Sequence, residues 1–149
     1  RDQPRSRGLG DVYKRQALRV VIDLAENANG GYIPMKDVAN RQSISLKYIT
    51  KIMPLLTKGG LVEGVHGKGG GYRLLKEPQD CTVGEILRLT EGTLAPINCV
   101  ELCSEPCDRV EDCRTLPMWR KLDELIENYL DSVTVADLMQ RNLADNYII

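Results

Sequence analysis

Histidine is nearly missing from this sequence, since His66 is the only one in 149 residues. A chain with one histidine, and with no glycine-rich phosphate loop that opens a helix, lacks the usual parts of hydrolytic and phosphoryl-transfer sites. Neighbouring carboxylates such as Glu111-Asp112 and Asp123-Glu124 fall on polar stretches, where solvation explains them. We therefore expect no enzymatic activity.

Long hydrophobic runs are also missing. No apolar run approaches the roughly 18 residues that a membrane span requires, although 42% of the residues are hydrophobic. A chain of 149 residues can form one compact domain, or a small domain with an appended helical part. We expect a soluble, cytoplasmic protein that does not contact the membrane.

Cysteine is scarce outside one segment. Four of the five cysteines, Cys99, Cys103, Cys107 and Cys113, lie within sixteen residues, and Cys81 stands apart. An odd count and such crowding argue against a scaffold of disulfides that joins distant parts of a fold. Cys81 comes just before a predicted helix, where a buried or half-buried thiol is expected.

The four clustered thiols permit several chemistries. Three, three and five residues separate them. Iron-sulfur clusters accept cysteines from a single loop, whereas structural zinc favours pairs two to four residues apart. A disulfide switch would need no metal. The spacing favours an iron-sulfur cluster and leaves zinc, a thiol switch and inert thiols as alternatives.

The first sixteen residues differ from the rest. They contain no initiator methionine, and apolar periodicity begins only at Ala17. The peptide DVYKRQ, from Asp11 to Gln16, is also what a transposase adapter used in sequencing libraries encodes when translated. We expect residues 1–16 to be an adapter artefact and exclude them from the fold prediction. A genuine basic, disordered arm is the alternative.

Charge is divided between the two halves of the remaining chain. Residues 17–76 carry nine Lys and Arg against four Asp and Glu, whereas residues 77–149 carry six against fifteen. Such an asymmetry indicates that the front half meets a polyanion.

Three helices are predicted in the basic half. Apolar residues recur at helical spacing in segments 17–31, 33–42 and 43–60. Ser45 is the expected N-cap of the third helix. Pro54 lies inside that helix and should kink or distort it.

A hairpin follows the three helices. Short strands at 61–65 and 72–75 flank the glycine-rich turn HGKGGG. A nucleotide-binding loop would open a helix, and here a strand follows instead. Three helices and a hairpin predict a winged helix-turn-helix over residues 17–76, whose third helix enters the DNA major groove. The expected DNA contacts, chosen as phosphate-binding and base-reading side chains, are Ser43, Ser45, Lys47, Tyr48, Lys51, His66, Lys68 and Arg73.

The acidic half, residues 77–149, is predicted to be helical on both sides of the cysteine loop. Thr82 caps a helix that runs to about Glu91, and Thr134 caps a short final helix. Between them, residues 116–133 form a long helix that requires a partner for its apolar stripe, and a dimer contact is the economical one. The predicted stripe is Trp119, Leu122, Ile126, Tyr129 or Leu130, and Val133.

Several of these segments together resemble one known family. The stretches ALRVVIDLA, ISLKYITKIMPLLTKGGLVEGVHGKGGGYRL and TVGEILRLTEG, followed by the cysteine segment and Trp119, are similar to the IscR/NsrR family of bacterial winged-helix transcription regulators. The resemblance covers residues 17–140. It implies a homodimer that binds a palindromic operator, with the long helix at the dimer interface. It also implies a 2Fe-2S or 4Fe-4S cluster, held by three cysteines, whose state changes DNA affinity.

The family's cysteine triad is most similar to Cys99, Cys107 and Cys113, which leaves Cys103 as an extra thiol or a fourth ligand. The resemblance has two departures. Leu116 stands where iron-sulfur regulators of the family place a histidine ligand, three residues after the last cysteine. His66 stands where the family usually has an arginine in the wing, so readout of a narrow minor groove should differ.

The sequence thus predicts a mainly α protein with a small β wing. The expected function is that of a dimeric DNA-binding regulator, a repressor, controlled by an iron-sulfur cluster. The alternative is a zinc-bound or metal-free winged-helix repressor that senses thiol oxidation, a small molecule or a partner protein. A small iron-sulfur electron carrier is disfavoured by the basic front half and the wing.

Overall fold

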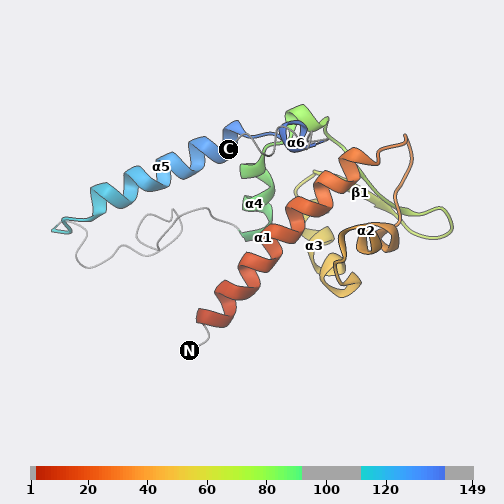
Figure 1. Ribbon diagram of the computed structural model, residues 1–149, viewed down its shortest axis with the longest axis horizontal. Coiled ribbons are helices and arrows are strands. Elements are labelled where there is room, and N and C mark those ends of the chain that lie inside the picture. Colours follow the sequence, from red (N-terminus) through yellow and green to blue (C-terminus); the bar gives the residue numbers. More distant parts are fainter. Residues whose placement is uncertain (1–2, 92–111, 140–149) are drawn as a thin grey trace, which may run out of the picture.

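A computed structural model describes residues 3–91 and 112–139 of the chain, with side chains for residues 14–90 and 112–139. The described part is helical apart from one two-stranded antiparallel sheet, as the sequence predicts. Figure 1 shows the order of the elements. They are α1 (Gln3–Glu26), α2 (Met35–Gln42), α3 (Leu46–Lys58), β1 (Val62–Val65), β2 (Gly71–Leu74), the 3-10 turn η1 (Pro78–Asp80), α4 (Val83–Glu91), α5 (Leu116–Ser132) and α6 (Val135–Leu138).

The helix α1 is the centre of the fold. It runs between α4 on one side and α2 with α3 on the other (Figure 1). Its residues Ala17, Val20, Val21 and Leu24 are buried, and they recur at helical spacing, so one stripe of α1 faces the core. The helix itself begins at Gln3, well before the predicted start at Ala17. The assignment of residues 1–16 to an adapter stays a prediction.

The second and third helices form the predicted helix-turn-helix. Between them Ser43 adopts a left-handed conformation with φ of 53°, and its N–H donates to the carbonyl of Ala39. The Ser45 hydroxyl accepts a hydrogen bond from the Lys47 amide at 3.2 Å, which confirms the predicted N-cap. The helix α3 continues through the exposed Pro54 and is capped by Gly59. The helical spacing predicts an apolar face of Ile49, either Ile52 or Met53, and Leu56, and in the structure all four of these residues are buried.

The wing is the hairpin of β1 and β2, which pair from Val62 opposite Leu74 to Val65 opposite Gly71. The loop before α2 joins this hairpin, because Ile33 and Tyr72 exchange two backbone hydrogen bonds of 2.8 and 2.9 Å. Gly71 allows this approach, since a Cβ there would lie 2.2 Å from the Ile33 carbonyl oxygen. The wing is thereby held to the helix-turn-helix at its base.

The helices α4 and α5 are joined at one end by a short backbone bridge. The Val83 amide donates to the Val133 carbonyl at 2.9 Å, and the Val135 amide donates to the Cys81 carbonyl at 2.8 Å. The predicted helix caps are present, since Thr82 Oγ1 accepts from the Glu85 amide and Thr134 forms a capping box. Within residues 3–91 and 112–139, no helix has the length and apolarity of a membrane span.

The predicted single apolar stripe of α5 is wrong, because the helix has two apolar faces. Ile126, Leu130 and Val133 pack against Val83 and Leu87. A second set is exposed, comprising Met118 (54%), Leu122 (38%), Leu125 (54%) and Tyr129 (66%). The prediction merged the two faces, since periodicity alone could not reveal which residues α4 covers.

Candidate nucleic-acid interface

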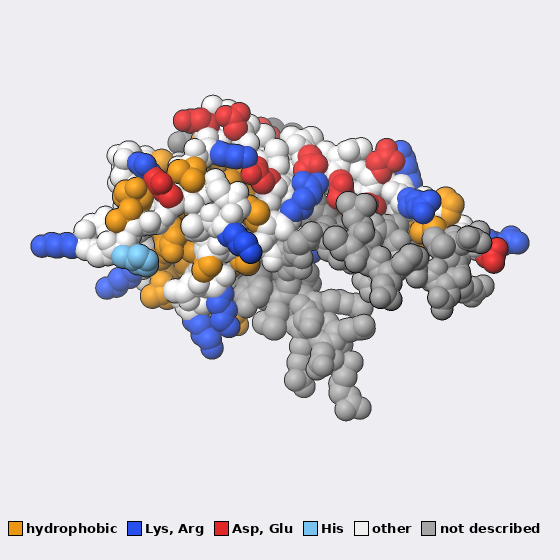
Figure 2. All heavy atoms as spheres, turned by 180° about the vertical axis from the view of Figure 1, so that it is seen from behind, with side chains coloured by type: hydrophobic (Ala, Val, Ile, Leu, Met, Phe, Trp, Pro, Cys, Tyr) orange, Lys and Arg blue, Asp and Glu red, His pale blue; other side chains and the backbone are white. Residues whose placement is uncertain are grey.

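The outer face of α3 is basic. Lys47, Lys51 and Lys58 are exposed and lie on the side of the helix opposite its buried stripe. Tyr48 is half-buried and packs against the core, so its ring supports the helix. Figure 2 shows Lys and Arg side chains along the lower edge of the winged-helix part and Asp and Glu along its upper edge. The structure therefore presents a cationic helix on one side of the molecule.

The N-terminal turn of α3 exposes small polar groups and one apolar side chain. Ser43 and Ser45 are both exposed, and the hydroxyl of Ser45 is engaged as the cap. Leu46, which the sequence analysis did not include among the DNA contacts, is 47% exposed at the first position of the helix. Residues at this end of a recognition helix reach base edges, where apolar side chains contact the thymine methyl group.

The tip of the wing carries His66 and Lys68, and both are exposed. The flanking Gly67 and Gly69 have φ values of 96° and 78°, which favour glycine. The Gly70 amide closes the turn on the Gly67 carbonyl at 3.0 Å. The tip is therefore a tight, cationic turn of small residues, a shape that can approach a nucleic-acid backbone closely.

Arg73, the last predicted DNA contact, is already engaged within the protein. Its Nε donates to Glu63 Oε1, and its guanidinium carbon lies 4.9 Å from the centre of the Tyr32 ring. The structure thus gives Arg73 a carboxylate partner on the opposite strand, whereas Lys68 at the tip of the wing forms no ion pair with any residue that the structure describes.

The cysteines fall into two environments. Cys99, Cys103 and Cys107 lie outside the described residues. Cys113 is half-buried just before α5, with its sulfur 3.4 Å from Thr115 Oγ1. Cys81 is fully buried in the main core, and burial raises the pKa of its thiol to about 11. The prediction that Cys81 is a buried thiol is therefore confirmed.

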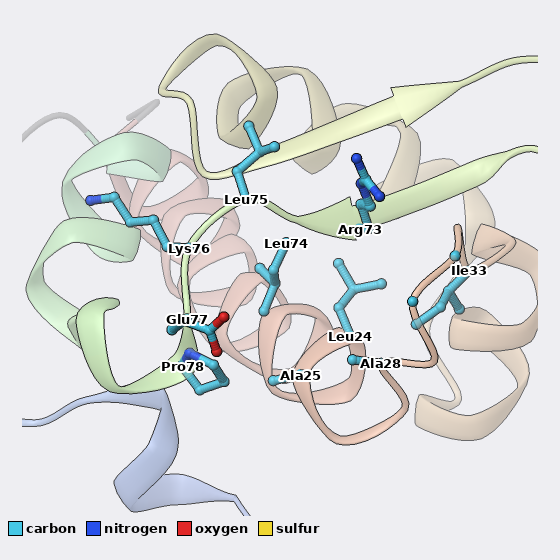
Figure 3. Close-up of a pocket in the computed structure, with 12 residues that line it drawn as sticks. Leu24, Ala25, Ala28, Ile33, Arg73, Leu74, Leu75, Lys76, Glu77 and Pro78 are labelled. Carbon is cyan, nitrogen blue, oxygen red and sulfur yellow. The ribbon is translucent and has the colours of Figure 1, made fainter.

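A cavity of about 350 Å³ lies between the end of α1, the loop before α2, and β2 (Figure 3). Apolar side chains such as Leu24, Ala25 and Leu74 line it together with Arg73 and Lys76. Both cations have carboxylate partners, Glu63 for Arg73 and Glu85 for Lys76. The two cations that line the cavity are therefore already paired within the protein.

Comparison with known proteins places this geometry in a family. The profile of the Rrf2 family, described as an iron-dependent transcriptional regulator, matches residues 12–141. The chain belongs to the Rrf2 family. Its relatives include the HTH-type transcriptional regulator IscR of Aliivibrio salmonicida, which is 34% identical over 128 residues that cover 86% of this chain and 75% of that protein.

Solved structures of the Rrf2 family share the fold. The IscR of T. potens matches with a TM-score of 0.68 and 34% identity, covering 90% of this chain and 85% of that one. CymR, the global cysteine regulator of B. subtilis, matches with a TM-score of 0.67 and 31% identity, covering 85% and 92%. Because these relatives are named as transcriptional regulators, the predictions of a winged-helix DNA-binding regulator and of a protein that is not an enzyme are confirmed.

One polar cluster of this Rrf2-family chain was missed by the sequence analysis. Asp23 on α1 is 1% exposed, and it accepts hydrogen bonds from Arg41 Nη2 at 2.6 Å, Arg41 Nε at 3.0 Å and Gln42 Nε2 at 2.9 Å. Arg19, one helical turn before Asp23, donates to the backbone carbonyl of Gln42. These contacts fix the last two residues of α2 immediately before the turn into α3. Asp23 hydrogen bonding also raises the pKa of Arg41.

Proposed function

We propose that this Rrf2-family regulator is a homodimeric repressor whose operator affinity is controlled by an iron-sulfur cluster bound in the cysteine loop. The observation that carries the proposal is the position of Cys113. Its thiol lies outside the core, three residues before Leu116 begins α5, so the cysteine loop leads directly into the long helix. The cationic face of α3 and the wing tip supply the DNA-binding half of the function.

The exposed face of α5 supports the homodimer. Met118, Leu122, Leu125 and Tyr129 follow one another at spacings of four, three and four residues, which is the seam of a helix pair. These four side chains are 38–66% exposed. A second copy of the same helix offers a matching stripe, and closed twofold pairing suits a palindromic operator.

The described residues fit a cluster at Cys113 and argue against one at Cys81. Cluster ligands are thiolates; the Cys113 thiol lies outside the core, whereas burial raises the pKa of the Cys81 thiol to about 11 and disfavours its thiolate. Cys99, Cys107 and Cys113 would hold the group, with Cys103 as an additional thiol. When bound, a cluster supplies a redox- and ligand-sensitive iron site. The chain itself contributes the thiols and the attachment of the loop to α5.

The alternative function, a zinc-bound or metal-free repressor, is favoured by one observation. Leu116 is buried, at 4% exposure, as the first residue of α5. The resemblance would place a histidine ligand there, and an apolar, buried side chain replaces it. A histidine-ligated 2Fe-2S site is therefore not reproduced at this position.

The test is purification without oxygen, followed by visible absorption and by iron, sulfide and zinc analysis of one sample. Absorption near 400 nm with iron and sulfide supports the cluster. A colourless protein with stoichiometric zinc supports the alternative. Cys107→Ala should remove the absorption and change affinity for DNA, whereas Cys81→Ala, a control outside the loop, should keep both. Unchanged DNA binding by Cys107→Ala would contradict control through the loop.

A further inference from the structure

We propose that Arg73 is a positioning residue that braces the wing, and that it does not bind a DNA phosphate. The wing brace is defined as Tyr32, Glu63 and Arg73. This inference rests on the proposed function, in which the wing binds DNA. It gives different roles to Lys68 and Arg73, two cations of the wing. Lys68 at the tip contacts DNA, whereas Arg73 at the base holds the tip in place.

Three contacts converge in the wing brace. Glu63 and Arg73 lie opposite each other in the register of β1 and β2. Arg73 Nε and the Tyr32 hydroxyl both donate to Glu63 Oε1, the latter at 3.2 Å. The Arg73 guanidinium lies over the Tyr32 ring, with its carbon 4.9 Å from the centroid. Figure 3 shows the Arg73 side chain rising from β2 towards the neighbouring strand.

The backbone next to these side chains forms the same connection. Ile33, the neighbour of Tyr32, exchanges two hydrogen bonds with Tyr72, the neighbour of Arg73. The side-chain brace therefore reinforces a backbone bridge between the wing and the loop that leads into α2. Since α2 and α3 form the helix-turn-helix, the brace ties the wing's direction to that of the recognition helix.

Charge and geometry oppose a phosphate contact by Arg73. Its guanidinium is matched by a carboxylate and stacked on an aromatic ring, so binding a phosphate would require the loss of both contacts or would bring Glu63 close to the phosphate. Lys68 forms no ion pair within the described part of the chain and lies on the exposed turn. Lys68 and Arg73 therefore have different environments although both lie on the wing: Lys68 is exposed, whereas Arg73 is paired with Glu63 and stacked on Tyr32.

The test measures affinity for a DNA duplex that the full-length protein selects from a random library, by fluorescence anisotropy over a range of salt concentrations. Glu63→Gln removes a negative charge from the wing. The brace predicts that this variant binds about threefold to tenfold more weakly, the scale of one exposed ion pair and one cation–π contact. A phosphate contact by Arg73 predicts the opposite, a tighter complex, and that result would overturn the proposal.

Two further variants separate positioning from direct contact. Arg73→Lys keeps the charge but loses the planar, stacked group. The brace therefore predicts weaker binding with an unchanged slope of log affinity against log salt. Lys68→Gln, the matched control, should reduce that slope by about 0.9, as expected for one lost phosphate contact. Near-native affinity of Arg73→Lys, or a comparable slope loss on Arg73→Gln, would refute the brace.

Amide hydrogen exchange tests the brace without DNA. In Glu63→Gln and Arg73→Lys, the amides of Ile33 and Tyr72 should exchange faster than in the wild type, while those of α1 stay protected. Unchanged protection at Ile33 and Tyr72 would reject the brace. Failure of the wild type to bind any duplex would instead count against the proposed function, so the two failures are distinguishable.

Discussion

Asp23→Asn should destabilise the protein strongly although the two side chains have the same shape. Asp23 is 1% exposed, and its carboxylate accepts four hydrogen bonds, three from Arg41 and one from Gln42. Asparagine replaces one of the two carboxylate oxygens with an NH2 donor. That donor would face either Arg41 or Gln42, whose groups are donors themselves, so at least one buried hydrogen bond is lost whichever way the amide is turned.

The magnitude follows from the burial of the two partners. Breaking a fully buried ion pair costs about 3–5 kcal/mol, because one charge is left without its partner. The Arg41 side chain is 38% exposed and can recover some hydration, so we expect a loss of about 2–4 kcal/mol for Asp23→Asn. A domain with an unfolding free energy of about 5–15 kcal/mol should still fold.

Urea unfolding followed by circular dichroism measures the loss. Asp37→Asn is the matched control, since Asp37 is exposed on α2, and there we expect a change within about 0.5 kcal/mol. Asp23→Asn should also weaken DNA binding at temperatures where it remains folded, because Gln42 precedes the turn into α3. A loss below about 1 kcal/mol for Asp23→Asn would show that the hydrogen bonds to this carboxylate do not stabilise the fold as argued.

Three further predictions concern the core thiol, the contact between α4 and α5, and the exposed face of α5. Burial raises the pKa of Cys81 from 9.0 to about 11. The free energy of unfolding should therefore keep its full value below pH 9 and fall by up to about 2–3 kcal/mol as the pH rises to 11. Cys81→Ala should flatten this dependence of the unfolding free energy on pH. The hydrogen bond from Arg88 lowers the pKa of Asp131 below its ordinary 3.8. Stability from this exposed pair is therefore present above pH 4 and disappears as the pH falls further, and Asp131→Asn should cost about 0.5 kcal/mol at pH 7 and nothing at pH 2. If the proposed homodimer forms through the exposed face of α5, Leu125→Glu should make the protein monomeric in sedimentation velocity, whereas the neighbouring exposed control Asn128→Glu should not. A Leu125→Glu variant that is still dimeric would place the interface elsewhere.

The local part of the fold was predictable from the sequence. The Ser45 cap, the helical spacing of apolar residues in α3 and the glycine turn of the wing all depend on residues within about one or two turns of each other. Periodicity and capping report such short-range relations directly. The position of Lys47 in the predicted third helix likewise made it an expected DNA contact, and the structure exposes it.

Longer-range relations could not be predicted, since they depend on which surfaces meet. Asp23 and Arg41 are 18 residues apart on different helices, and nothing in the spacing of either helix indicates their contact. Arg73 was assigned to DNA by charge and location, because its partner Tyr32 lies in a loop far from it in sequence. For the same reason, the two apolar faces of α5 were merged until the position of α4 was known.

The arrangement of α4 and α5 shows how the cysteine loop could act on DNA binding under the proposed function. The Val83–Val133 and Val135–Cys81 hydrogen bonds fasten the start of α4 to the end of α5, while the cysteine loop connects the opposite ends of the two helices. Ile86 of α4 is buried in the same core as α1 and α3. Under the proposed function, a change in the loop would therefore act on the ends of α4 and α5 that these two hydrogen bonds do not join, while the joined ends stay fixed to the DNA-binding domain. If a second copy binds the exposed face of α5, a change in this loop would rotate one recognition helix relative to the other. Half-site spacing makes operator affinity sensitive to that rotation.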